Sequence, residues 1–229
     1  MLAQLKLRPF YFITSFLLLV FALILCLSFS KEECFQLLNS FHTTQMDLFF
    51  IYYTIAGDGL ISVAAVMCLA ILKKRKEALT LLIAYISSGL FAQLLKNIIS
   101  EPRPQLYFKQ LTIQYNYFVN GVTLYSNNSF PSGHTTSAFA MATVIALLSN
   151  NKSISILSLF LAALVGYSRV YLAQHFLSDV LAGAFIGIVF GMLSYYFIWQ
   201  QNRVNLYKAL HKLKQEVSQY KIPLFLMLI

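Results

Sequence analysis

The sequence predicts an all-α protein, a polytopic integral membrane protein that folds as a six-transmembrane-helix bundle. Hydrophobic residues make up 59% of the 229 residues and charged residues only 11%, whereas an ordinary soluble domain carries about 25% charged residues. The mean hydropathy is +0.68, and the apolar residues fall into runs of about 20, the length that a helix needs to cross the hydrocarbon layer. These observations exclude an ordinary soluble globular domain.

Six apolar runs are long enough to be membrane spans. They cover, approximately, residues 10–30, 55–72, 78–97, 133–149, 154–172 and 177–199. The first run follows Lys6 and Arg8, as the apolar part of a secretory signal would. However, Ser28-Phe29-Ser30 is a poor cleavage site, so we interpret this run as a retained anchor. An even number of spans places both termini on the same side of the membrane.

The distribution of basic residues predicts which side that is. Most of the 17 Lys and Arg residues lie on the side that holds the termini, notably in the loop 73–76 and in the tail 201–229. Basic residues mark the cytoplasmic side of a membrane protein, so both termini are expected to be cytoplasmic. We interpret 201–229 as a basic cytoplasmic tail lying on anionic lipid. Topology thus accounts for most of the net charge of +9, and no nucleic-acid partner is predicted.

The sizeable outward-facing segments are residues 31–54 and 98–132. The first mixes charged residues with aromatic ones, which is compatible with an amphipathic stretch on the outer leaflet. The second has no clean periodicity. Both are too short to form separate domains, so residues 1–229 are expected to form a single membrane-embedded domain.

Two of the few outward cations, Lys96 and Arg103, lie around the end of the third span. Pro102 and Pro104 flank Arg103 and prevent the helix from continuing. The chain is therefore expected to turn and bring the guanidinium back toward the ammonium group. Taken alone, the pair could be two cations that reach from a membrane boundary into water.

A second cluster stands immediately before the fourth span, in Pro131-Ser132-Gly133-His134. A proline near a helix start, a serine hydroxyl and an unobstructed glycine amide suit an anion site, because free N–H groups and the helix dipole both favour negative charge. His134 would then lie beside a bound anion. Taken alone, the cluster could be a helix cap.

The third cluster lies in the outer turn between the fifth and sixth spans. His175 and Asp179 are four residues apart, so at a helix start they share a face and the carboxylate can hold one ring nitrogen. Arg169 lies six residues before His175, and a chain break near 172–174 is needed to bring the two together. Taken alone, the pair could be a structural hydrogen bond.

Topology places all three clusters on the same outer face. Three cations, two histidines, a serine, a carboxylate and a helix N-terminus can therefore meet in one pocket. Ionisable residues at membrane depth are costly, at about 2.5–3.5 kcal/mol each at the bilayer centre on insertion scales, so their clustering indicates a functional site.

In order and spacing, the three clusters resemble the three-part signature of the phosphatidic acid phosphatase type 2 superfamily. This superfamily also includes bacterial acid phosphatases and vanadium haloperoxidases. The matching elements are Lys96 with six residues before Arg103-Pro104, then Pro131-Ser132-Gly133-His134, then Ser168-Arg169 with five residues before His175 and three more before Asp179.

The resemblance implies a metal-independent phosphatase that works through a phosphohistidine. His175 would attack phosphorus with Asp179 orienting it, and His134 would protonate the leaving oxygen and then activate water. The phosphate oxygens would be held by three cations, a hydroxyl and a backbone amide, those of Lys96, Arg103, Arg169, Ser132 and Gly133. No metal or other cofactor is expected, because the fixed cations supply the electrostatic stabilisation.

The sequence therefore predicts a phosphatase in a bacterial cytoplasmic membrane, with its active site facing outward and a lipid phosphate or diphosphate as substrate. Undecaprenyl diphosphate, phosphatidylglycerophosphate, phosphatidic acid and the phosphates of lipid A are all candidates. A phosphotransferase with the same intermediate and a non-enzymatic anion or lipid transporter remain as alternatives. Asp58, near the outer end of the second span, either shapes the substrate entrance or starts a helix, and we favour the helix start.

Overall fold

The computed structural model describes residues 8–115, 117–200 and 215. Within these residues every regular element is helical, which confirms the all-α prediction. The predicted tail 201–229 lies outside the described residues, apart from position 215. The elements are α2 (Pro9–Ser28), α3 (Lys31–Asn39), α4 (Thr44–Tyr53), the 3-10 turn η1 (Thr54–Gly57), α5 (Gly59–Ile71), α6 (Arg75–Ile99), α7 (Pro104–Gln110), α8 (Gly133–Leu148), α9 (Lys152–Tyr171), α10 (Leu177–Tyr195) and the π-helical turn η2 (Tyr196–Gln200).

Four helical segments in the described part of the chain are long and apolar enough to cross a membrane. They begin with α2, α6, α9 and α10, and α4 with α5 makes a fifth if this pair, bent by 53°, is counted as one span. The remaining apolar helix, α8, has 16 residues and is about 24 Å long at 1.5 Å per residue. By length and composition, the described residues therefore contain four or five spans, and the expected count of six is not confirmed.

The second predicted span, 55–72, begins too late. In the structure, helix α4 starts at Thr44, where the Thr43 side chain accepts a hydrogen bond from the amide of Met46. The chain then runs through η1 into α5. The segment 31–54 is accordingly two capped helices and not one amphipathic stretch. Ser30 caps the first of these helices, and the cap at Thr43 starts the second and so divides the segment. Each side chain satisfies an amide that a helix start leaves unpaired.

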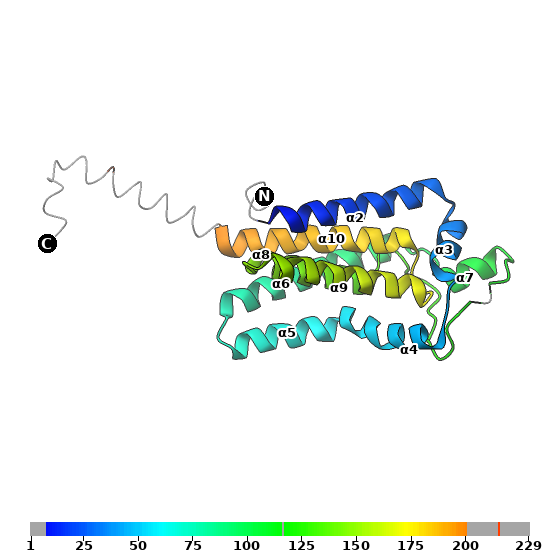
Figure 1. Cartoon of the computed structure of the whole chain (residues 1–229), viewed down its shortest axis with the longest axis horizontal. Coiled ribbons are helices and arrows are strands. Elements are labelled where there is room, and N and C mark those ends of the chain that lie inside the picture. Colours follow the sequence, from blue (N-terminus) through cyan, green and yellow to red (C-terminus); the bar gives the residue numbers. More distant parts are fainter. Residues whose placement is uncertain (1–7, 116, 201–214, 216–229) are drawn as a thin grey trace, which may run out of the picture.

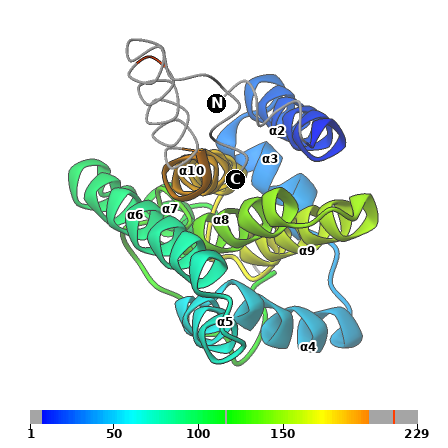
Figure 2. The ribbon, with the colours of Figure 1, turned by 90° about the vertical axis from the view of Figure 1, so that its left-hand side faces the viewer.

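Helix α8 lies between α6, α9 and α10 when the bundle is viewed along its length (Figure 2). Three glycines spaced four residues apart, Gly183, Gly187 and Gly191, let α10 approach α8 closely. A Cβ atom at Gly183 would lie 2.6 Å from the carbonyl oxygen of Ser132. This close approach brings the start of α10 to the start of α8, and the amide of Ser132 donates to the carbonyl of Asp179 at 3.0 Å.

We expect the Gly187→Ala variant to be less stable, because its Cβ would lie 2.5 Å from the Thr136 carbonyl oxygen and 2.7 Å from the Ala140 amide nitrogen. Such overpacking costs about 1–3 kcal/mol. Thermal unfolding in detergent measures the effect. Gly89→Ala in α6 is the matched control, since the described structure places nothing within 4 Å of its Cβ. Equal losses in both variants would contradict this account of the contact.

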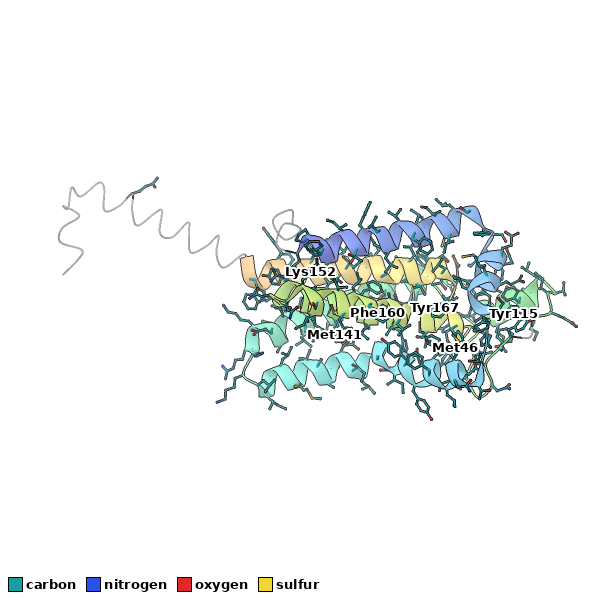
Figure 3. All side chains as sticks on the ribbon, viewed as in Figure 1. Met46, Tyr115, Met141, Lys152, Phe160 and Tyr167 are labelled. Atoms are coloured by element: carbon teal, nitrogen blue, oxygen red, sulfur yellow. The ribbon has the colours of Figure 1, made fainter. Side chains whose placement is uncertain are left out.

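The two ends of the bundle are distinct. The start of α2 and the end of α10 lie together at one end, and α3 and α7 lie at the other (Figure 1). Figure 3 places Tyr115 at the end with α3 and α7, and Lys152 toward the opposite end. The end of α6, the start of α8 and the turn between α9 and α10 all belong to the end that carries Tyr115, so the three sequence clusters meet on one face as expected.

Candidate active site

His175 and Asp179 form a buried pair at the start of α10. The Nδ1 atom of His175 lies 3.4 Å from Oδ2 of Asp179, and the two side chains are 2% and 0% exposed. The amide of Phe176 also donates to this oxygen, at 3.0 Å. An imidazole held at Nδ1 presents Nε2 as its reactive nitrogen.

Burial lowers the pKa of His175 well below its usual range, although the hydrogen bond to Asp179 opposes this shift. The ring is therefore neutral near pH 7, and a neutral ring nitrogen carries the lone pair that a nucleophile needs.

Ser129 is a buried residue of this site that the sequence analysis did not identify. Its hydroxyl donates to Oδ2 of Asp179 at 2.5 Å and lies 3.5 Å from Nδ1 of His175. Its amide donates to the carbonyl of Glu101 at 3.0 Å. Ser129 thus joins the carboxylate to the loop that follows α6. Its position three residues before Ser132 is the signal that could have pointed to it.

Arg169 lies on the last turn of α9 and is 6% exposed. Its Nη1 atom donates to the Thr54 hydroxyl at 2.6 Å, while its buried Nε atom has no hydrogen-bond partner among the described residues. A buried donor without an acceptor is costly. Among the described residues this donor is left unsatisfied, and a bound anion would satisfy it. Nothing in the sequence pattern predicted this contact with Thr54.

Lys96 and Arg103 contact the same stretch of the long outer loop. The Nζ atom of Lys96 donates to the carbonyl of Asn128 at 2.7 Å, and Nε of Arg103 donates to the carbonyl of Asn127 at 3.0 Å. The expected turn between the two cations is present, since α6 ends at Ile99 and α7 begins at Pro104. Because the two side chains donate to the carbonyls of consecutive residues, the structure brings Lys96 and Arg103 together.

The start of α8 carries the second cluster. Ser132 caps the helix, and its Oγ atom accepts a hydrogen bond from the Thr135 hydroxyl at 2.8 Å. At Gly133 no atom of the described structure lies within 4 Å of the position that a Cβ would take. Since Gly133 is the first residue of the helix, its N–H has no intrahelical acceptor. Both groups therefore remain suited to an anion.

His134 is the second residue of α8 and directly follows the Ser132 cap and Gly133. The charges of four residues act on its ring, those of Arg169, Asp58, Arg103 and Lys96. The site residues named from the sequence are thus gathered around one helix start. Asp58 caps α5 by accepting from the amide of Leu60 at 2.9 Å, which agrees with the helix-start interpretation.

This geometry defines a class of protein: a helical membrane protein in which fixed cations and a helix start surround a buried histidine–carboxylate pair. The PAP2 superfamily matches residues 77–203. The chain belongs to this family of membrane lipid phosphatases, and its apolar helices and membrane relatives indicate an integral membrane protein.

Individual relatives agree with the family. A segment of 71 residues is 44% identical to the lipid A 1-phosphatase of Porphyromonas gingivalis, but it spans only 16% of that protein. An undecaprenyl-diphosphatase of Sulfolobus acidocaldarius is 29% identical over 71% of this chain and 75% of its own length. Phosphatidylglycerophosphatase B of Bacillus subtilis is 32% identical over 51% of this chain and 56% of its own length.

Solved structures share the fold. The crystal structure of Aquifex aeolicus LpxE superposes with a TM-score of 0.62 at 30% identity, over 71% of this chain and 92% of the other. A transmembrane PAP2-type phosphatidylglycerolphosphate phosphatase from Bacillus subtilis gives a TM-score of 0.61 at 24% identity, over 83% and 95% of the two chains.

Proposed function

We propose that this protein hydrolyses a lipid phosphate or diphosphate at the outer face of a bacterial cytoplasmic membrane. The observation that carries the proposal is the unpaired, buried Nε of Arg169, in a site that also holds the buried pair of His175 and Asp179. A neutral histidine oriented by a carboxylate is a nucleophile. Buried donors without an acceptor suit the oxygens of a phosphoryl group.

In the first half-reaction, Nε2 of His175 attacks phosphorus. A nitrogen–phosphorus bond forms, the bond to the leaving oxygen breaks, and His134 gives that oxygen a proton. In the second, His134 takes a proton from water, the water oxygen attacks the phosphohistidine, and inorganic phosphate leaves as the nitrogen–phosphorus bond breaks. The oxygens of the transferring group are held by Lys96, Arg103, Arg169, the Ser132 hydroxyl and the Gly133 amide.

The topology that we propose has six spans, in which α8 is added to the five that length and composition identify. Residues 1–229 form one membrane-embedded domain in this topology. At 16 residues α8 is shorter than the hydrocarbon layer is thick. However, its position among α6, α9 and α10 keeps most of it away from lipid. Six spans place both termini on the same side of the membrane. The basic loop 73–76 lies on that side, which identifies it as the cytoplasmic side.

A lipid substrate is supported by the surface around the site. Helix α2 exposes large apolar side chains along its length, including Phe16, Leu17, Phe21 and Leu27, as a helix facing lipid does. A site at the end of such helices lies at the depth of a lipid headgroup. The relatives named above support undecaprenyl diphosphate, phosphatidylglycerophosphate and lipid A phosphates as candidates. Phosphatidic acid is the fourth candidate, on the resemblance of the sequence alone.

Phosphate release by the purified protein in EDTA, across a panel of these four lipid phosphates, tests the proposal. We expect turnover of at least one lipid without added metal, and inhibition by vanadate, whose trigonal-bipyramidal form resembles the transferring group. Loss of all activity in EDTA with recovery on adding Mg²⁺ would contradict the mechanism. Transfer of phosphate to an acceptor other than water would identify a phosphotransferase, and no turnover of any lipid would favour a transporter.

A further inference from the structure

The turn between α9 and α10 is closed by its own backbone. Beyond the end of α9, the amide of Gln174 donates to the carbonyl of Arg169 at 2.9 Å. The amide of Ala173 donates to the carbonyl of Val170 at 3.0 Å. Ala173 has φ +53°. These are the two bonds and the left-handed residue of a Schellman motif, in which glycine is usual. An alanine in this conformation is strained, so the turn depends on other contacts.

Asn39, the last residue of α3, supplies such a contact. Its Nδ2 atom donates to the carbonyl of Val170 at 2.8 Å and to that of Tyr171 at 2.6 Å. These carbonyls belong to the last turn of α9, where a helix lacks its own donors. The side chain of Asn39 is fully buried, at 0% exposure. One carboxamide from a distant segment therefore completes the end of the helix.

Tyr115 settles the orientation of that carboxamide. Its hydroxyl donates to Oδ1 of Asn39, which leaves Nδ2 facing the two carbonyls and uses every polar atom of the side chain. The ring of Tyr115 stacks on Phe108 with centroids 4.9 Å apart and packs against Phe35. Asn39 is thus held by its own helix, α3, and by the outer loop that carries Tyr115.

The groups that this turn positions are those of the proposed reaction. Arg169 is on the turn of α9 that Asn39 caps. The amide of His175 donates to the carbonyl of Arg169 at 3.1 Å, which places the imidazole relative to the guanidinium. Gln174, between them, accepts from Nη1 of Arg103 at 3.1 Å through Oε1. A shift of the turn would displace all three groups at once.

We propose that Asn39 is a positioning residue for the reaction, and that α3 serves to bring this carboxamide to the turn between Arg169 and His175. The inference rests on the proposed function. Without the side chain of Asn39, the buried carbonyl of Tyr171 loses this donor and the strained turn relaxes. Phosphate can still bind to the cations, but the nucleophile and the guanidinium no longer hold the in-line geometry that phosphoryl transfer requires.

The test compares Asn39→Ala and Tyr115→Phe with Tyr11→Phe. Tyr11 is the matched control, because its hydroxyl also makes a buried hydrogen bond to a side chain, Oγ1 of Thr143 at 2.9 Å, in a helix away from the turn. Measurements are kcat and KM for phosphate release from whichever lipid the wild-type protein turns over, and thermal unfolding in detergent.

For Asn39→Ala we expect kcat to fall about 10–100-fold, the scale of a displacement of about 1 Å in a catalytic group, with KM changed less than about 3-fold. Tyr115→Phe should lower kcat by a smaller factor in the same direction. Tyr11→Phe should lower the unfolding temperature but leave kcat unchanged. If Asn39→Ala does not fold, the kcat of Tyr115→Phe tests the proposal in its place.

Two outcomes would overturn the proposal. The first is a kcat for Asn39→Ala equal to that of the wild type. The second is a loss of kcat in Tyr115→Phe no larger than that in Tyr11→Phe. Failure of the proposed function is distinguishable from either, because the wild-type protein would then release no phosphate from any lipid of the panel.

Discussion

Replacing His175 with alanine is expected to abolish phosphate release while leaving the protein folded. The imidazole is the nucleophile of the proposed mechanism, and its loss removes the covalent route entirely. Loss of a nucleophile in other hydrolases costs about 10⁶-fold in kcat, so turnover should fall below detection. Phosphate release by the purified variant in detergent, together with its thermal unfolding, measures the effect.

Trapping of the phosphorylated enzyme supplies the control. Wild-type protein quenched during turnover should carry an acid-labile phosphate that His175→Ala lacks. His134→Ala should still form it from a substrate with an acidic leaving group, because such a group departs without a proton from His134. Substantial turnover by His175→Ala, or a phosphate trapped on another residue, would refute the assignment of the nucleophile.

Replacing Arg169 with lysine should be nearly as harmful, although the charge is conserved. In the structure, Nη1 of Arg169 donates to Thr54, and Nε has no hydrogen-bond partner among the described residues. In the proposed mechanism Nε binds a phosphate oxygen, so one rigid guanidinium has two tasks. An ammonium group is a point charge and cannot perform both. We expect a loss of about 2–4 kcal/mol in transition-state stabilisation, the scale of one missing oxyanion donor. This corresponds to about 30–1,000-fold in kcat/KM.

The matched control for Arg169→Lys is Lys152→Ala, which removes a cation at the opposite end of the bundle (Figure 3). Its kcat/KM should equal that of the wild type, since electrostatic effects over such a distance are screened in salt. Unchanged kcat/KM in Arg169→Lys would show that the site needs only positive charge, and would contradict the two-point grip inferred from the geometry.

The sequence by itself determined the features that depend on composition and short spacing. Apolar runs of about 20 residues identify helices that cross a membrane, whatever packs around them. The spacing of four residues between His175 and Asp179 places them on one helical face. Pro102 and Pro104 end a helix locally. These properties are local, and for this reason the cluster residues and the helical architecture could be predicted.

The tertiary structure alone decided which distant groups complete the site. Ser129, Thr54 and Asn39 contact residues that lie 50, 115 and 132 positions away along the chain, at Asp179, Arg169 and Tyr171. A polar residue that satisfies a distant partner leaves no periodic signal, because the pairing depends on how the helices pack. The early start of the second span has a similar cause: α4 contains four aromatic residues and one acidic residue, and it is the helix cap at Thr43 that sets its boundary.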